Sequence, residues 1–187
     1  MLMAYNVKDV FYLDTSIGTT TSTGVGVSTL DLSAYIDPIA RGKSKATGLA
    51  IYKVHFDVQD DGANNPVAAT SNGQFRAGLM SNPGVPAAAV GSASMTPDTL
   101  NAGNALMIAG ADYAFGGTAD GDPPIPQQKW LEPSEQVPYV VVRDSVIMVM
   151  SVLVAMGAAA NLYARLECAQ ISLDQSTLNQ LLRTQTV

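Results

Sequence analysis

The stretch from Leu49 to Val58 constrains the fold more than any other part of this chain, because its side chains alternate strictly in polarity. One face of the expected strand carries Tyr52, Val54, Phe56 and Val58. The other face carries Lys53, His55, Asp57 and Gln59. A period of two with one polar face is typical of an antiparallel strand that covers a core on one side only. We therefore expect Tyr52, Val54 and Phe56 to point inward, and Phe56→Ala to cost about 3–5 kcal/mol if the ring is buried.

Two further strands are predicted near the end of the chain, from Val146 to Met156 and from Asn161 to Leu173. The first is apolar on both faces, which favours a central strand that is covered on both sides. The second alternates, with one apolar face formed by Leu162, Ala164, Leu166 and Cys168. A Gly-Ala turn at residues 157–160 separates the two runs. We expect the two runs to pair as a hairpin.

Shorter strand patterns occupy Val10–Leu13, Val25–Leu32, Gln74–Met80, Ala105–Ile108, Asp112–Phe115 and Val137–Arg143. The total is about eight strands joined by long loops, with no helices alternating between them. This pattern predicts an all-β sandwich, specifically a single jelly roll of about eight antiparallel strands with a short C-terminal helix or arm.

A chain of 187 residues suits one domain. We expect residues 1–187 to form a single jelly-roll domain, with an N-terminal arm at 1–24 and a helical tail at 174–187. Asp174 or Ser176 can cap that helix, and its apolar stripe consists of Leu178, Leu181 and Leu182. A helix this short is unstable alone and must dock on something. We expect the three leucines to make an inter-subunit contact; docking on the chain's own sandwich is the alternative.

Charge is scarce, at 14% of residues against about 25% in an average globular protein. Few charges leave few solvated faces, which favours a surface that is covered by partners. The net charge of −6 argues against a sequence-specific nucleic-acid binder, which would carry a basic face.

The residues that usually carry catalysis are almost absent. His55 is the only histidine and Cys168 the only cysteine, so neither a zinc cluster nor a disulfide is expected. Gly42-Lys43-Ser44 matches only the end of a phosphate-binding loop, because Asp37 stands where the first glycine is required. We expect no enzyme activity, no catalytic residues, no cofactor and no resident metal.

Two loops leave binding alternatives open. The loop from Asp57 to Asn65 is rich in carboxylate and amide oxygens, which calcium prefers, although hairpin loops use the same residues for backbone reasons. The solitary Trp130 lies near five acidic residues, namely Asp112, Asp120, Asp122, Glu132 and Glu135. A tryptophan with carboxylates could bind sugar, which keeps a lectin-like or spike-type carbohydrate module as the alternative function. A tryptophan that fills the edge of a core is the simpler interpretation.

The uncharged run from Ser145 to Ala160 raises the question of a membrane span. At 16 residues it is shorter than the roughly 20 that a spanning helix needs, and its valines and isoleucine favour a buried strand. The start of the chain lacks the basic and apolar regions of a signal peptide, so we expect the protein to be made and assembled inside a cell.

The assembled pattern resembles the small single-β-barrel major capsid proteins of icosahedral, internal-membrane-containing viruses of archaea and thermophilic bacteria. The resemblance rests on the stretch from Leu30 to Pro38 leading into the strand Leu49–Val58, on the apolar run Val146–Leu173, and on the terminal segment Asp174–Val187. It implies an eight-stranded jelly roll, capsomers of several copies, and a shell over a membrane around double-stranded DNA. It carries over no catalytic residue.

These observations together predict a structural protein, a viral major capsid subunit that self-assembles. Its expected partners are copies of itself, with a second capsid protein and an underlying viral membrane left open. The expected location is the virion, after assembly in the host cytoplasm.

Overall fold

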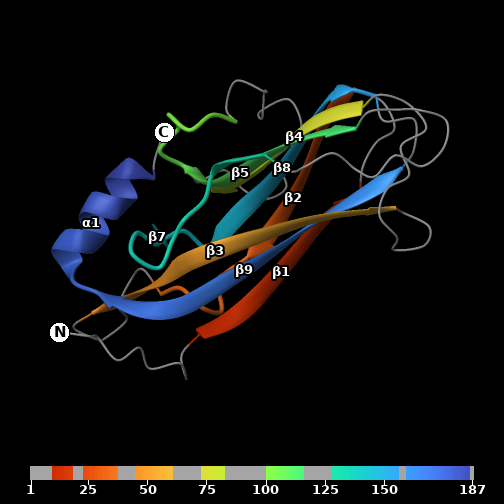
Figure 1. Ribbon diagram of the computed structural model, residues 1–187. Coiled ribbons are helices and arrows are strands. Elements are labelled where there is room, and N and C mark those ends of the chain that lie inside the picture. Colours follow the sequence, from red (N-terminus) through yellow and green to blue (C-terminus); the bar gives the residue numbers. More distant parts are fainter. Residues whose placement is uncertain are drawn as a thin grey trace.

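A computed structural model describes residues 10–18, 23–37, 45–60, 73–82, 100–115, 128–155 and 159–185. These residues form nine strands and one helix (Figure 1). The strands are β1 (Val10–Gly18), β2 (Gly24–Asp31), β3 (Ala46–Asp60), β4 (Gly73–Ser81), β5 (Met107–Phe115), β6 (Gln128–Leu131), β7 (Tyr139–Val141), β8 (Ser145–Val154) and β9 (Ala160–Leu173). The helix is α1 (Gln175–Thr184). The prediction of an all-β fold with a short C-terminal helix is confirmed.

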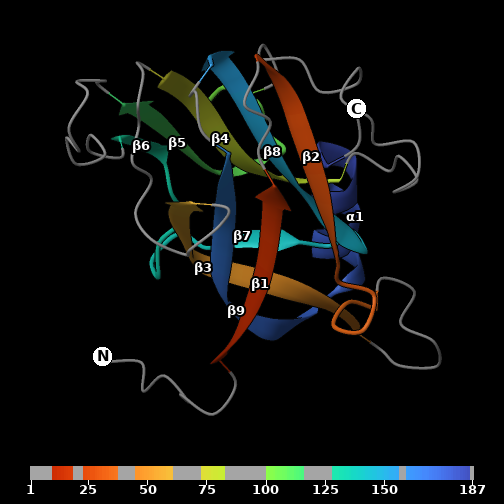
Figure 2. The same ribbon diagram turned by 90° about the vertical axis from the view of Figure 1, so that its right-hand side faces the viewer.

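The strands form two antiparallel sheets packed face to face (Figures 1 and 2). The order in the first, called here the β1 sheet, is β1-β9-β3-β7, and the order in the second, the β2 sheet, is β2-β8-β4-β5-β6. The pairs are nested: β1 pairs with β9, β2 with β8, β3 with β7 and β4 with β5. A chain that pairs first with last in this way and alternates between two sheets is a jelly roll. The short strand β6 extends the β2 sheet beyond this eight-stranded frame.

The main core lies between the two sheets, and β9 shows how the sequence builds it. Its Leu162, Ala164, Leu166 and Cys168 are all buried there, as their alternation predicts. From β8, Val146, Met148, Met150 and Val152 enter the same core, whereas Ile147 and Val149 are buried on the opposite face. The prediction that this strand is covered on both faces is therefore confirmed from Ser145 to Val152, whereas the last two residues of β8 are exposed.

One inward prediction for β3 is wrong, because this strand contains a β-bulge. The pairing with β9 shifts register between Ile51 and Lys53, which leaves Tyr52 as the extra residue. A bulge moves the following side chains to the other face. Before it, Leu49 and Ile51 face the main core; after it, Val54 does, and Phe56 packs against the same core while partly buried. Tyr52 instead lines a surface hollow with Glu132 and Glu167.

The predicted hairpin of Val146–Leu173 is also wrong. The strand β8 belongs to the β2 sheet and β9 to the β1 sheet, so the two are not hydrogen-bonded neighbours. Their partners lie far away in sequence: β8 pairs with β2 and β4, and β9 with β1 and β3. The apolar pattern identified both strands, but a jelly roll connects them across the sandwich rather than within one sheet.

Part of the segment expected as an N-terminal arm is a strand of the sandwich. Residues 10–18 form β1, whose partner is β9. Phe11, Leu13 and Ile17 of this strand pack against the main core, and the burial of these side chains stabilises the segment as part of the sheet. Residues 1–9 lie outside the described part of the chain.

The helix α1 packs against one end of the sandwich (Figure 1). Its N-cap is Asp174, whose carboxylate accepts a hydrogen bond of 2.7 Å from the Thr177 N–H, as predicted. That bond lowers the pKa of Asp174. Among the described residues, no helix is long and apolar enough to cross a membrane.

Candidate functional site

The only histidine and the only cysteine of the chain, His55 and Cys168, lie on opposite faces of the β1 sheet. His55 is on the outer, polar face of the β1 sheet, where its Nε2 lies 2.7 Å from Glu167 Oε1. Cys168 is fully buried on the inner face, and burial raises the pKa of its thiol to about 12, which keeps it protonated. Within the described ranges, no three His, Cys, Asp or Glu side chains are grouped so that they could hold a metal ion. Most of the Asp57–Asn65 loop, the candidate calcium site, lies outside those ranges.

Trp130 is occupied by contacts within its own chain. It lies in β6, and its ring packs directly on Gly110 of β5, where any side chain would collide with the indole. The neighbouring Gly78 of β4 is covered in the same way by Leu100. These two glycines face each other across β4 and β5, so together they make room for Leu100 and Trp130 on the outer face of the β2 sheet. This agrees with the interpretation of Trp130 as a residue that fills the edge of a core.

The acidic residue that lies on the neighbouring strand β5 is already paired. Asp112 accepts two hydrogen bonds from Arg76, of 2.7 and 2.8 Å. The guanidinium of Arg76 also lies 5.2 Å from the centroid of the Trp130 ring. Trp130 thus contacts both Gly110 and Arg76 of its own chain. Asp120 and Asp122 lie outside the described residues.

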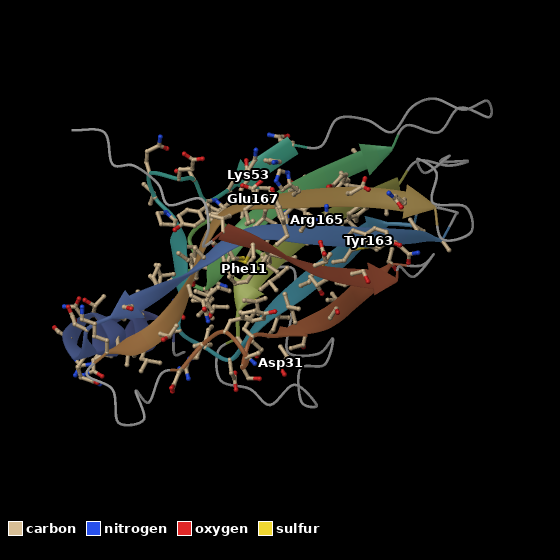
Figure 3. The ribbon with its side chains drawn as sticks, turned by 90° about the horizontal axis from the view of Figure 1, so that it is seen from below. Phe11, Asp31, Lys53, Tyr163, Arg165 and Glu167 are labelled. Carbon is tan, nitrogen blue, oxygen red and sulfur yellow. The ribbon has the colours of Figure 1, made fainter. Side chains whose placement is uncertain are left out.

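The outer face of the β1 sheet is a regular polar surface (Figure 3). The register places side chains from β1, β9 and β3 in rows: Tyr12, Glu167 and Lys53; then Asp14, Arg165 and His55; then Ser16, Tyr163 and Asp57. This face holds an open recess of about 780 Å³. The alternation in β3 and β9 predicted its polar residues, but only the pairing with β1 brings Tyr12 and Asp14 beside them.

The two lateral sides of the sandwich differ in how their strand edges are protected. On one side, β7 has three residues, and the side chain of Gln185 hydrogen-bonds to its backbone at Val140 O, 2.6 Å, and Val142 N, 3.3 Å. The edge strand β6 on that side has four residues and carries an ion pair of Lys129 with Glu132. Short strands, charges and covering segments are the usual protection of sheet edges.

The other side, called here the open side, consists of β1 and β2, which run side by side as the outermost strands of the two sheets (Figure 2). They have nine and eight residues, with neither lysine nor proline. No described strand pairs with their outer edges. Core-facing side chains remain partly exposed here, namely Phe11 and Leu13 of β1 and Leu30 of β2. Val10 and Tyr12 are 43% and 59% exposed.

The three leucines predicted to contact another subunit belong to a small apolar cluster at the end of the sandwich. Leu178 is 1% exposed and packs with Ala46, Val142 and Leu173 of its own chain. Leu181 and Leu182 are partly buried at the margin of this cluster. The helix therefore docks on its own sandwich, the alternative that the sequence left open. An inter-subunit contact by this segment stays a prediction.

No protein-family model matches the chain, and no curated protein matches its sequence. Solved structures with a similar fold include the VP1 pentamer of human polyomavirus 6, with 10% identity, 92% of this chain and 98% of that chain covered, and a TM-score of 0.48. Desmodium yellow mottle tymovirus gives 10% identity, 93% and 94% coverage and a TM-score of 0.34. The virus-like particle of the Macrobrachium rosenbergii nodavirus has 14% sequence identity, with 91% of this chain and 97% of that chain covered and a TM-score of 0.33. All three are viral capsid proteins.

Proposed function

We propose that this chain is the subunit of a viral capsid, a structural protein that self-assembles through its open side. The observation that carries the proposal is a jelly roll with few charges and two long edge strands, β1 and β2, whose outer edges no described strand pairs with. Jelly rolls occur as viral capsid domains, lectins and cupins.

The open side supports a contact between copies for a physical reason. An edge strand presents a row of backbone N–H and C=O groups that can pair with another chain, and monomeric proteins block such edges. In this chain β7 is blocked by Gln185, whereas β1 and β2 carry no comparable protection among the described residues. The partial exposure of Phe11, Leu13 and Leu30 adds apolar area that a neighbouring copy would bury.

Two matched substitutions test this assignment of the interface. Val10→Lys places a charge on the open side, and Val137→Lys places the same charge at a valine that is 73% exposed beside β7. We expect sedimentation velocity to show large assemblies for the native chain and for Val137→Lys, and small species for Val10→Lys. Assembly of Val10→Lys at the native level would show that the open side is not the interface.

The finer part of the proposal follows the resemblance of the sequence. The chain would belong to the single-β-barrel capsid proteins of membrane-containing viruses and would form capsomers, with an underlying membrane and a second coat protein as additional partners. Residues 1–187 would act as one domain, located in the virion after assembly in the host cytoplasm. Lipid analysis and protein staining of purified particles test the membrane and the second protein separately.

A further inference from the structure

We propose that the recess on the outer face of the β1 sheet binds a neutral oligosaccharide. The geometry points to this ligand through three properties of the recess: its size, its two tyrosines and its balance of hydrogen-bond donors and acceptors. The site is distinct from Trp130, which lies on the outer face of the other sheet.

The size and shape of the recess suit an extended ligand. Its volume of about 780 Å³ falls in the range of roughly 300–1,000 Å³ that is usual for ligand sites. It spans three strands, about 10 Å across at the usual strand spacing, and several residues along each. Lining residues come from three adjacent strands, the edge strand β1 and then β9 and β3, whose backbone pairing holds them in register.

The aromatic residues provide surfaces for stacking. Tyr12 is 59% exposed, and the guanidinium of Arg165 lies 5.8 Å from its ring centroid, which helps hold the ring in place. Tyr163 lines the recess from the neighbouring strand β9. A sugar ring presents C–H groups on its face, and these can pack on a tyrosine while the hydroxyls at its rim reach polar side chains. Exposed tyrosine is well suited to this because it combines apolar area with a polar end.

The polar side chains are held in pairs that combine a donor with an acceptor. Arg165 donates to Asp14 at 2.7 Å, Gln59 donates to Asp57 at 2.6 Å, and His55 contacts Glu167 at 2.7 Å. Each carboxylate keeps further lone pairs, and each donor group except the imidazole keeps further N–H bonds. Sugar hydroxyls both donate and accept, so they match such pairs without requiring either partner to be released.

The charges of the recess decide against other ligand classes. Three carboxylates line it, against one guanidinium and one imidazole, so phosphate, nucleic acid and acidic sugars would meet net repulsion. Asp14 already faces the guanidinium of Arg165 and Glu167 already contacts His55, so among the described lining residues a polycation would find only Asp57 without a basic partner. A neutral, hydroxyl-rich ligand is the class that remains.

The test is calorimetric titration of the full chain with maltohexaose, cellohexaose, xylohexaose and chitin hexasaccharide as neutral probes. Sialyllactose serves as the acidic probe and spermine as the cationic probe. We expect at least one neutral probe to bind with a dissociation constant of about 1 mM or tighter. Tyr12→Ala should weaken this binding about tenfold, whereas Tyr12→Phe, which keeps the ring, should stay within about twofold of the native chain.

Two controls place the binding on the recess. Val137→Ala, at an exposed site away from the recess, should bind like the native chain. The fluorescence of Trp130, which reports on the other sheet, should not change on binding. The proposal is overturned if no neutral probe binds, if sialyllactose or spermine binds more tightly than every neutral probe, or if Tyr12→Ala binds like the native chain.

Discussion

Gln185 closes the edge of β7, and its removal is the substitution with the most clearly defined effect on this fold. The residue is 3% exposed and follows the last turn of α1. Its Nε2 donates to Val140 O at 2.6 Å, and its Oε1 accepts from Val142 N and from Ser81 Oγ, both at 3.3 Å. Residues 140 and 142 direct these groups to the same edge of the strand, so the amide bonds to β7 as a neighbouring strand would.

The magnitude follows from the groups that Gln185→Ala would leave without a partner. The Val142 N–H loses its hydrogen bond at a buried position and the Val140 carbonyl at a partly buried one, and each such loss costs about 1–3 kcal/mol. Some access of water to the shortened side chain will reduce the sum. We expect Gln185→Ala to lower the free energy of unfolding by about 2–4 kcal/mol.

Gln180→Ala is the matched control, because Gln180 is an exposed glutamine on the same helix. A substitution at an exposed site should change stability by no more than about 0.5 kcal/mol. Urea unfolding followed by circular dichroism measures both variants, and hydrogen exchange at the Val142 amide reports the edge directly. Equal stabilities for the two variants, or unchanged protection of the Val142 amide in Gln185→Ala, would refute the role given to Gln185.

Three further substitutions and one chemical labelling experiment test the core. Phe75 is fully buried, whereas Phe56 is only partly buried. In urea unfolding, Phe75→Ala should lower the free energy of unfolding by about 3–5 kcal/mol, and Phe56→Ala should lower it clearly less. Equal losses of stability in the two variants would contradict the placement of β3. Gly110→Ala should collide with Trp130 and destabilise the β2 sheet, with a red-shifted tryptophan emission as its signature; an unchanged spectrum and stability would count against this packing. The Cys168 thiol should resist iodoacetamide until the chain unfolds. Burial raises the pKa of this thiol from 9.0 to about 12, so the stability that the buried thiol contributes is fully present below pH 9.0 and is lost as pH rises toward 12. Rapid labelling of the native chain by iodoacetamide would contradict the burial of Cys168.

The sequence predicts the strands better than their partners, and β9 illustrates why. Its alternation is local, so Leu162 and Leu166 could be assigned to the core without knowledge of the neighbours. The partner of a strand depends on residues far along the chain: β1 and β9 pair although about 150 residues separate them, as in Asp14 with Arg165. The nested pairing of a jelly roll therefore had to come from the structure, and the expected hairpin from β8 to β9 failed for the same reason.

Two local features also could not be predicted from the sequence, namely the bulge in β3 and the burial of Gln185. The bulge at Tyr52 reverses the inward face of β3 in mid-strand, and nothing in the alternation of the neighbouring residues indicates it. Gln185 lies at the end of a polar helix segment, where its burial depends entirely on the position of β7. By contrast, the cap at Asp174 was predictable because it needs only residues within the first turn.

The recess and the open side could not be predicted from the sequence for the same reason, because both depend on which strands become neighbours. The polar face of β3 and β9 was visible in the sequence, but the recess exists because β1 adds Tyr12 and Asp14 to it. The open side likewise depends on which strands end up outermost in each sheet.

Electron microscopy of the purified full chain is the most direct test of the central claim, that this jelly roll is a capsid subunit. The account predicts closed particles of uniform size, whose density at subunit resolution fits the sandwich with β1 and β2 at the contact between neighbouring copies. Monomers or small oligomers at every concentration and salt condition, with no closed particles, would contradict it.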